Sequence, residues 1–160
     1  MTFSARVLTV SDGVVAGERD DASGPALVAR LEAAGATVDR HTVCADGVAS
    51  VGDALRTLAD GFSGLIVTTG GTGFGPRDLT PEGTRTVIER EAPGFVEAVR
   101  RASDAEGRPF GMLSRAVAGT VGATLVINLP GSPGGAVEAL DVCLPGIPHA
   151  LELLAGGRPH

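Results

Sequence analysis

The hydrophobic positions of this chain alternate between short continuous runs and longer stretches with helical spacing. The short apolar runs, which predict strands, cover residues 3–10, 36–44, 65–69 and 124–129. Between these runs, apolar residues recur three or four positions apart, as in Leu27, Leu31 and Ala34, and this spacing predicts amphipathic helices. The alternation predicts a three-layer α/β/α fold with a mostly parallel central sheet. No linker or repeat divides the pattern, so we expect residues 1–160 to form a single domain.

Small residues, hydroxyls and prolines mark the predicted helix ends. Ser23-Gly24-Pro25 opens one helix, and Ser50 is expected to cap the next with its hydroxyl. Thr80-Pro81-Glu82 predicts another helix start, with the Thr80 hydroxyl as the cap and proline in the first turn. The segment 107–118 is ambiguous, and we interpret it as an irregular segment or an edge strand.

Composition excludes several classes of function. Aromatic residues make up 3% of the chain, which removes the stacking platforms of single-strand nucleic-acid binders, and a net charge of −6 disfavours a nucleic-acid partner. All 13 basic residues are arginine, so a P-loop lysine and a lysine nucleophile are both excluded. Two isolated cysteines, Cys44 and Cys143, indicate reduced core thiols. With no signal peptide or long apolar span in the sequence, we expect a cytoplasmic protein with no membrane partner.

The segment from Thr69 to Gly73 carries the strongest functional signal. It places Gly70, Gly71 and Gly73 directly after the predicted strand 65–69. A glycine loop in this position can present several backbone N–H groups to a bound anion. The spacing matches neither the dinucleotide fingerprint nor the Walker loop, so the loop predicts a phosphate site of a different kind.

Three other predicted strand ends carry small polar residues: Ser11-Asp12-Gly13, Asp46-Gly47 and Gly131-Ser132. Each alone is ordinary turn chemistry, because Gly, Asp and Ser favour turns. In an open α/β sheet, however, ligands bind outside the carboxyl ends of the strands. Four such ends, the glycine loop included, therefore predict one shared cleft.

Two carboxylates give that cleft its expected chemistry. Asp78 follows the glycine loop and Asp46 follows the strand 36–44. Either one is compatible with a plain turn or helix-dipole role. Together with phosphate oxygens, however, such a pair suits Mg²⁺, which keeps several waters and needs few protein ligands.

Arginine, serine and histidine residues leave other possibilities open. Arg77 and Arg115 suit anion binding, although such arginines more often pair with a local acid or remain solvated. Ser114 and Ser132 are candidate donors to a ligand phosphate. Neither has an obvious histidine base beside it, which disfavours a Ser–His–Asp hydrolase. The three histidines show no metal-ligand spacing, and we expect surface or core positions for His41, His149 and His160.

Taken in order along nearly the whole chain, these motifs resemble the molybdopterin-binding family of the MogA/MoaB type, which includes the G domain of gephyrin. The segments that carry the resemblance are Thr9-Val10-Ser11-Asp12-Gly13, Asp21-Ala22-Ser23-Gly24, Thr69-Gly70-Gly71-Thr72-Gly73, Arg77-Asp78-Leu79-Thr80-Pro81-Glu82, Met112-Leu113-Ser114-Arg115, Asn128-Leu129-Pro130-Gly131-Ser132-Pro133 and Pro148-His149-Ala150-Leu151.

The resemblance implies molybdenum cofactor biosynthesis, in which Mg-ATP adenylylates molybdopterin and releases pyrophosphate. It implies that Asp46 and Asp78 are the catalytic, Mg²⁺-binding carboxylates, and that Ser114 lies near the pterin phosphate. The substrate and nucleotide site is expected to include Ser11, Asp12, Thr69, Gly70, Gly71, Thr72, Gly73, Ser114, Arg115, Pro130, Gly131 and Ser132. A homotrimer, or a hexamer built from two trimers, is also implied. The alternatives are a non-catalytic molybdopterin carrier or scaffold and a stand-alone Mg-dependent nucleotide hydrolase.

Overall fold

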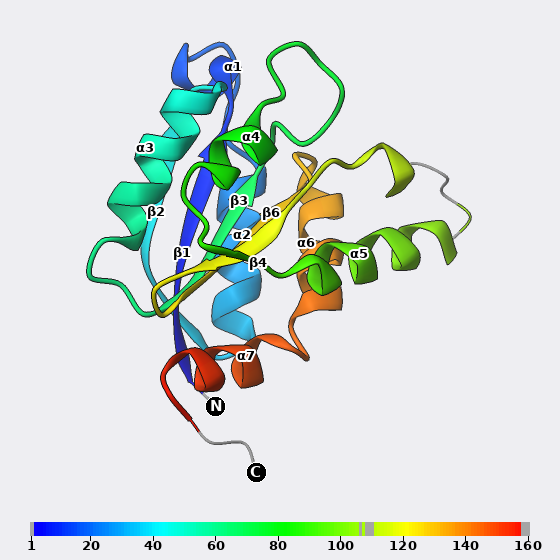
Figure 1. Ribbon diagram of the computed structural model, residues 1–160. Coiled ribbons are helices and arrows are strands. Elements are labelled where there is room, and N and C mark those ends of the chain that lie inside the picture. The colour runs from blue at the N-terminus through cyan, green and yellow to red at the C-terminus, as the bar shows by residue number, and fades with distance from the viewer. Residues whose placement is uncertain (1, 106, 108–110, 158–160) are drawn as a thin grey trace.

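The computed structural model describes residues 2–105, 107 and 111–157. Its elements in chain order are β1 (Phe3–Val10), α1 (Asp12–Val15), α2 (Ser23–Ala33), β2 (Ala36–Cys44), α3 (Val48–Ala59), β3 (Gly64–Thr69), α4 (Thr80–Arg85), β4 (Arg90–Glu91), α5 (Pro93–Ala105), the 3₁₀ turn η1 (Gly111–Leu113), β5 (Ala118–Val121), β6 (Thr124–Leu129), α6 (Pro133–Cys143) and α7 (Ile147–Leu154). Figure 1 shows the sheet running through the molecule with helices on both sides. None of the helices in the described residues is long and apolar enough to cross a membrane.

The described strands form a six-stranded sheet in the order β2-β1-β3-β6-β5-β4. Neighbours among β2, β1, β3 and β6 are parallel, whereas β5 is antiparallel to β6 and β4 is antiparallel to β5. The predicted mostly parallel α/β sheet is therefore confirmed. The chain passes from β1 to β2 on one side and then to β3 on the other, so the strand order reverses between β1 and β3. Ligands of open α/β sheets bind at such a reversal.

Two apolar layers cover the two faces of the sheet, as the alternation of side chains along a strand requires. On one face, Val7, Val67 and Ile127 pack with residues of α2, α5, α6 and α7. On the other, Leu8 and Ile66 pack with α3. All six residues of β3 and all six of β6 are buried, which is why their sequences read as continuous apolar runs.

Two local predictions need correction. Ser50 does not cap α3, because the helix begins two residues earlier with Gly47 at the N-cap, and the Ser50 hydroxyl donates to backbone carbonyls before it. Thr80 does not cap α4 either, since its hydroxyl donates to the Gly70 carbonyl, 2.9 Å away. Of the two interpretations of the segment 107–118, the irregular one is confirmed for residues 111–117, which form the 3₁₀ turn η1 and then no regular element. Residues 108–110 lie outside the described part, and β5 starts at Ala118, between β6 and β4.

Asn128 makes buried hydrogen bonds on the sheet face that carries α3 and α4. It is 2% exposed, and its Nδ2 donates to the hydroxyls of Thr68 and Thr84, at 3.0 and 2.9 Å. Its Oδ1 accepts from the Val117 amide at 3.2 Å. One buried amide thus joins β6, β3, α4 and the segment before β5.

We expect Asn128→Ala to lower the free energy of unfolding by about 2 kcal/mol, because it leaves the buried Val117 N–H unpaired. Urea unfolding measures this. The control is Thr57→Ala, which removes an exposed hydroxyl bond on α3 and should change stability by less than about 0.5 kcal/mol. Equal stability of the two variants would contradict the expectation.

Candidate functional site

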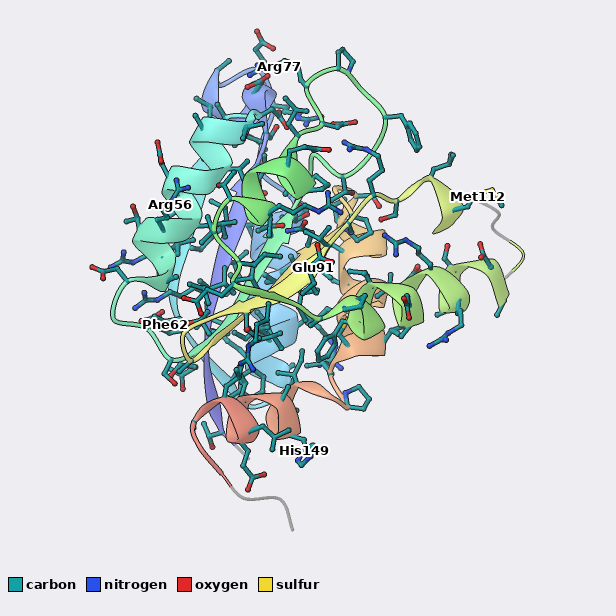
Figure 2. All side chains as sticks on the ribbon, viewed as in Figure 1. Arg56, Phe62, Arg77, Glu91, Met112 and His149 are labelled. Carbon is teal, nitrogen blue, oxygen red and sulfur yellow. The ribbon has the colours of Figure 1, made fainter. Side chains whose placement is uncertain are left out.

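A polar cleft of about 720 Å³ opens at the carboxyl ends of β1, β3 and β6, where the strand order reverses. It is lined by Thr9, Val10, Ser11, Val14, Arg19, Asp20, Asp21, Ala22, Ser23, Asp46, Thr69, Gly70, Gly71, Thr72, Gly73, Asp78, Gly131, Ser132 and Pro133. The structure thus brings residues from all four of the strand ends that the sequence singled out to one cleft. Figure 2 places Arg77, beside this region, at the opposite end of the molecule from His149 on α7.

The glycine loop lines the polar cleft through Gly70, Gly71 and Gly73, and two of these positions do not accommodate a side chain. Gly70 and Gly71 have φ values of +101° and +66°, a region that side chains rarely enter. A Cβ on Gly70 would lie 2.3 Å from the Val10 carbonyl oxygen, and one on Gly71 would lie 2.3 Å from the Thr80 hydroxyl. Both positions therefore require glycine for backbone conformation and for space.

Protein donors hold the carbonyl side of this loop. The Thr80 hydroxyl and amide donate to the carbonyls of Gly70 and Gly71, and the amide and Nε of Arg115 donate to those of Thr72 and Gly73. Within residues 2–105, 107 and 111–157, the N–H groups of Gly71, Thr72 and Gly73 have no hydrogen-bond acceptor. The loop is thus anchored on one side, and its amides remain available to an anion.

Arg115 is paired with an acidic side chain and stabilises the loop, so it is not a free cation. Its guanidinium pairs with the Glu82 carboxylate on α4 and also donates to the carbonyls of Gly73 and Asp78. It does not line the polar cleft. Of the roles left open by the sequence (anion binding, pairing with a local acid or solvation), pairing with a local acid is therefore the one seen here.

Asp46 and Asp78 both line the polar cleft, half-buried, from opposite ends of the loop. Asp78 Oδ2 accepts from the Gly75 amide at 2.8 Å, and Asp46 Oδ2 accepts from the Asp12 amide at 2.8 Å. Among the residues that the structure describes, Arg19 is the only basic side chain in the cleft lining, against four carboxylates, with Asp20 and Asp21 as the other two. The cleft thus combines anion-binding amides with an excess of negative charge.

A second cavity of about 370 Å³ adjoins the polar cleft and has a more apolar wall. The residues shared by the two are Thr72, Gly73 and Ser132. Ser114 and Pro130 line this second cavity rather than the polar cleft, together with parts of α5 and α6 such as Val99 and Ala139. Asp12 lies in neither lining; its hydrogen bonds join it to Asp46 and Arg77.

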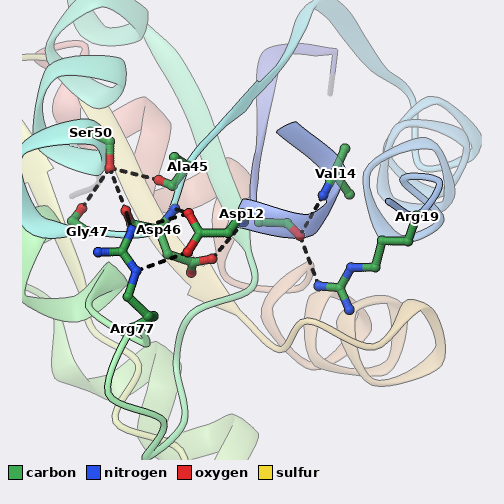
Figure 3. A network of polar contacts seen from close by, with 9 residues as sticks. Asp12, Val14, Arg19, Ala45, Asp46, Gly47, Ser50 and Arg77 are labelled. Atoms are coloured by element: carbon green, nitrogen blue, oxygen red, sulfur yellow. Dashed lines mark hydrogen bonds and ion pairs between the residues drawn. The ribbon is translucent and has the colours of Figure 1, made fainter. Parts of the chain in front are cut away.

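Several residues of the polar cleft were not predicted as site residues. Arg19 Nη2 donates to the Ser11 hydroxyl at 2.9 Å, and that hydroxyl accepts from Val14 N to cap α1 (Figure 3). Nothing in the irregular segment around Arg19 signals this contact.

The histidines were expected at surface or core positions. His41 lies against Asp21, with Nε2 and Oδ2 3.0 Å apart, and His160 lies outside the described residues.

Asp21 holds the start of α2 against β1 at one side of the polar cleft. Its Oδ2 accepts from the Thr9 hydroxyl at 2.7 Å, and its Oδ1 accepts from the Gly24 amide at 2.9 Å. A Cβ on Gly24 would lie within 2.5 Å of side-chain atoms of His41, Thr9 and Asp21. An aspartate three residues before an amide at a helix start is a known capping pattern, and this pattern in the sequence could have identified Asp21.

The fold and site define an open α/β protein with a cleft at the switch point of its sheet, where ligands of such folds bind, and loop amides of this kind suit phosphate groups. Residues 6–149 match the family described as "Probable molybdopterin binding domain". The chain belongs to this family, and the resemblance seen in the sequence is confirmed.

Individual relatives agree with this assignment. The chain is 35% identical over 158 residues to the molybdopterin adenylyltransferase of Helicobacter pylori, an alignment that covers 97% of this chain and 89% of that protein. It is 37% identical to the molybdenum cofactor biosynthesis bifunctional protein of Chlorobaculum tepidum, with 94% of this chain covered, but it spans only about half (48%) of that relative's length. The structure of the molybdopterin biosynthesis enzyme MoaB from Thermus thermophilus superposes with a TM-score of 0.89 at 44% identity, covering 96% of this chain and 97% of the other.

Proposed function

We propose that this protein is a molybdopterin adenylyltransferase, which transfers AMP from ATP to molybdopterin and releases pyrophosphate. The observation that carries the proposal is the pair of adjoining cavities with Thr72, Gly73 and Ser132 between them. The polar cleft has amides suited to a triphosphate and carboxylates suited to its cation, and the second cavity has the apolar wall suited to a flat heterocycle. The relative with the matching name aligns over nearly the whole chain.

The residues of the polar cleft fit a Mg²⁺ ion. Four carboxylates against one arginine would repel a triphosphate that arrived without a cation. In the part of the chain that the structure describes, His, Cys, Asp and Glu side chains form no cluster of three or more that could hold a metal. Asp46 and Asp78 with substrate phosphates and waters would suffice, since Mg²⁺ is commonly bound in this way. There the ion would neutralise charge that develops on the phosphate oxygens.

In the proposed reaction, an oxygen of the terminal phosphate of molybdopterin attacks the α-phosphorus of ATP. The bond from that oxygen to the α-phosphorus forms, and the bond from the α-phosphorus to the bridging oxygen breaks. The electron pair leaves with pyrophosphate. The substrate supplies the nucleophile, so the protein needs neither a lysine nor an activated serine. Its tasks are alignment and charge stabilisation, with the loop amides on phosphate oxygens and Ser114 on the pterin side.

We further propose that the chain works in the cytoplasm as a homotrimer, or as a hexamer of two trimers. The proposed oligomeric state rests on the family resemblance alone. Native mass spectrometry of the purified protein tests it, and a monomer or dimer at micromolar concentration would contradict it.

The function is tested by one AMP-transfer assay run with Mg-ATP, in the presence and absence of molybdopterin. We expect adenylyl-molybdopterin and pyrophosphate to appear in equal amounts, and only when molybdopterin is present. Binding of molybdopterin with no ATP-dependent product would instead identify a carrier or scaffold. ATP consumption without molybdopterin would identify a nucleotide hydrolase.

A further inference from the structure

Asp12 and Asp46 are joined by two reciprocal hydrogen bonds. The Asp12 amide donates to Asp46 Oδ2 at 2.8 Å, and the Asp46 amide donates to Asp12 Oδ1 at 3.0 Å. Figure 3 shows the two carboxylates facing each other's backbone. Each side chain therefore fixes the main chain of the other, which ties the end of β1 to the end of β2.

Arg77, which follows the glycine loop in the sequence, hydrogen-bonds to both members of this pair. Its Nε and Nη2 donate to the two Asp12 carboxylate oxygens at 3.0 and 3.2 Å, and Nη2 also donates to the Asp46 carbonyl at 2.7 Å (Figure 3). The hydrogen bonds from Arg77 hold the pKa of the Asp12 carboxyl below its usual range. Since its charge is matched by Asp12 and it lies outside the lining of the polar cleft, Arg77 is not placed to clamp a ligand phosphate.

The contacts leave one atom of Asp46 for the cleft. Its amide is engaged by Asp12, its carbonyl by Arg77 and Ser50, and its Oδ2 by the Asp12 amide. The remaining oxygen, Oδ1, lies 3.1 Å from the position that a Cβ on Gly71 would take. That oxygen is thus directed at the amide-rich loop by partners that do not themselves touch the cleft.

The same contacts contribute little to global stability. The side chains of Arg77 and Asp12 are 60% and 46% exposed, and exposed ion pairs are typically worth about 0–1 kcal/mol. Loss of the pair should therefore disturb Asp46 more than it disturbs the fold. Partners behind a metal-binding side chain have effects of this kind, because they set its orientation.

We propose that Asp12 and Arg77 are positioning residues that hold Asp46 Oδ1 toward the cation and phosphate side of the polar cleft. This inference rests on the proposed function, because that function supplies the cation and the triphosphate. It also gives Asp12 a role through Asp46, in place of direct contact with the nucleotide.

The test compares Asp12→Ala and Arg77→Ala with the wild type. Mn²⁺, a paramagnetic substitute for Mg²⁺, is titrated in the presence of α,β-methylene-ATP and followed by electron paramagnetic resonance. We expect the dissociation constant for Mn²⁺ to rise roughly 10- to 100-fold in both variants. The AMP-transfer assay should show a lower kcat at fixed Mg²⁺, with the KM for molybdopterin within about twofold of the wild type.

Arg30→Ala is the matched control, because it removes an exposed arginine–aspartate bridge, to Asp141, between α2 and α6. It should leave Mn²⁺ binding unchanged and lower the melting temperature about as much as Arg77→Ala does. Arg77→Lys keeps the charge but not the two-pronged geometry, so it should recover Mn²⁺ affinity only in part.

Wild-type Mn²⁺ affinity in both alanine variants would overturn the proposal. If Asp12→Ala does not fold, the exposed Arg77 variants decide the question alone. Failure of the wild type to transfer AMP would overturn the proposed function instead. The Mn²⁺ titration remains a separate measurement, so the two failures are distinguishable.

Discussion

Asp46→Asn and Asp78→Asn are each expected to reduce the rate of AMP transfer to molybdopterin roughly 100- to 1,000-fold, the usual cost of removing one preorganised electrostatic group. The two carboxylates enter the polar cleft from opposite ends of the glycine loop. Both substitutions delete a negative charge where the proposed reaction needs a cation beside the triphosphate. The measurement is pyrophosphate release with molybdopterin and Mg-ATP.

Asparagine is the informative replacement because it preserves the local hydrogen bonds. Its side-chain oxygen can still accept from the Asp12 amide at position 46 and from the Gly75 amide at position 78. The loop should therefore keep its shape, and the loss of rate then reports on charge. Asp53→Asn, on an exposed carboxylate of α3, should stay within about twofold of the wild type, as is usual for surface substitutions. Pyrophosphate release at the wild-type rate in both site variants would remove these carboxylates from the mechanism.

The sequence predicted the parts of the fold that follow from burial. β3 and β6 are buried along their whole length, so their apolar runs were unambiguous. Helix starts were less predictable, because a hydroxyl near a helix start has competing partners. Thr80 donates to the Gly70 carbonyl across the loop instead of capping α4, and this tertiary contact leaves no local signal. The two-residue strand β4 is too short for any periodicity.

The candidate site was predictable in outline for a different reason. Parallel strands end at one edge of a sheet, so Ser11, Asp46, Gly70 and Gly131 could be grouped without knowing their distances. What each side chain contacts could not be derived in this way. Asp12 looked like a ligand-binding residue, and the structure shows it bonded to Asp46 and Arg77. Arg19 reaches Ser11 from an irregular segment that no spacing rule describes.

Gly70→Ala is expected to lower the free energy of unfolding by roughly 3 kcal/mol. A left-handed backbone costs a residue with a side chain about 1–2 kcal/mol, and overpacking adds about 1–3 kcal/mol. Both apply here, since Gly70 has φ +101° and its Cβ would lie 2.3 Å from the Val10 carbonyl oxygen. That oxygen belongs to the backbone of β1, so no side-chain rotation relieves the contact.

Gly17→Ala separates these two costs. Gly17 also has a positive φ, +72°, but an added Cβ there meets nothing within 4 Å. It should therefore lose only the conformational share, about 1 kcal/mol. For a domain of this size, each kcal/mol shifts the melting temperature by about 2–4 °C, so calorimetry should place Gly70→Ala several degrees below Gly17→Ala.

Gly70→Ala also tests how strongly the rate of AMP transfer depends on the backbone at position 70. Relief of the contact must move the loop away from β1, and the amides of Gly71 to Gly73 move with it. AMP transfer should then fall even at temperatures where Gly70→Ala is fully folded, whereas Gly17→Ala should retain its rate. Equal melting temperatures for the two variants would mean that the loop yields without cost, and the rigid amide cradle on which the proposed chemistry depends would have to be abandoned.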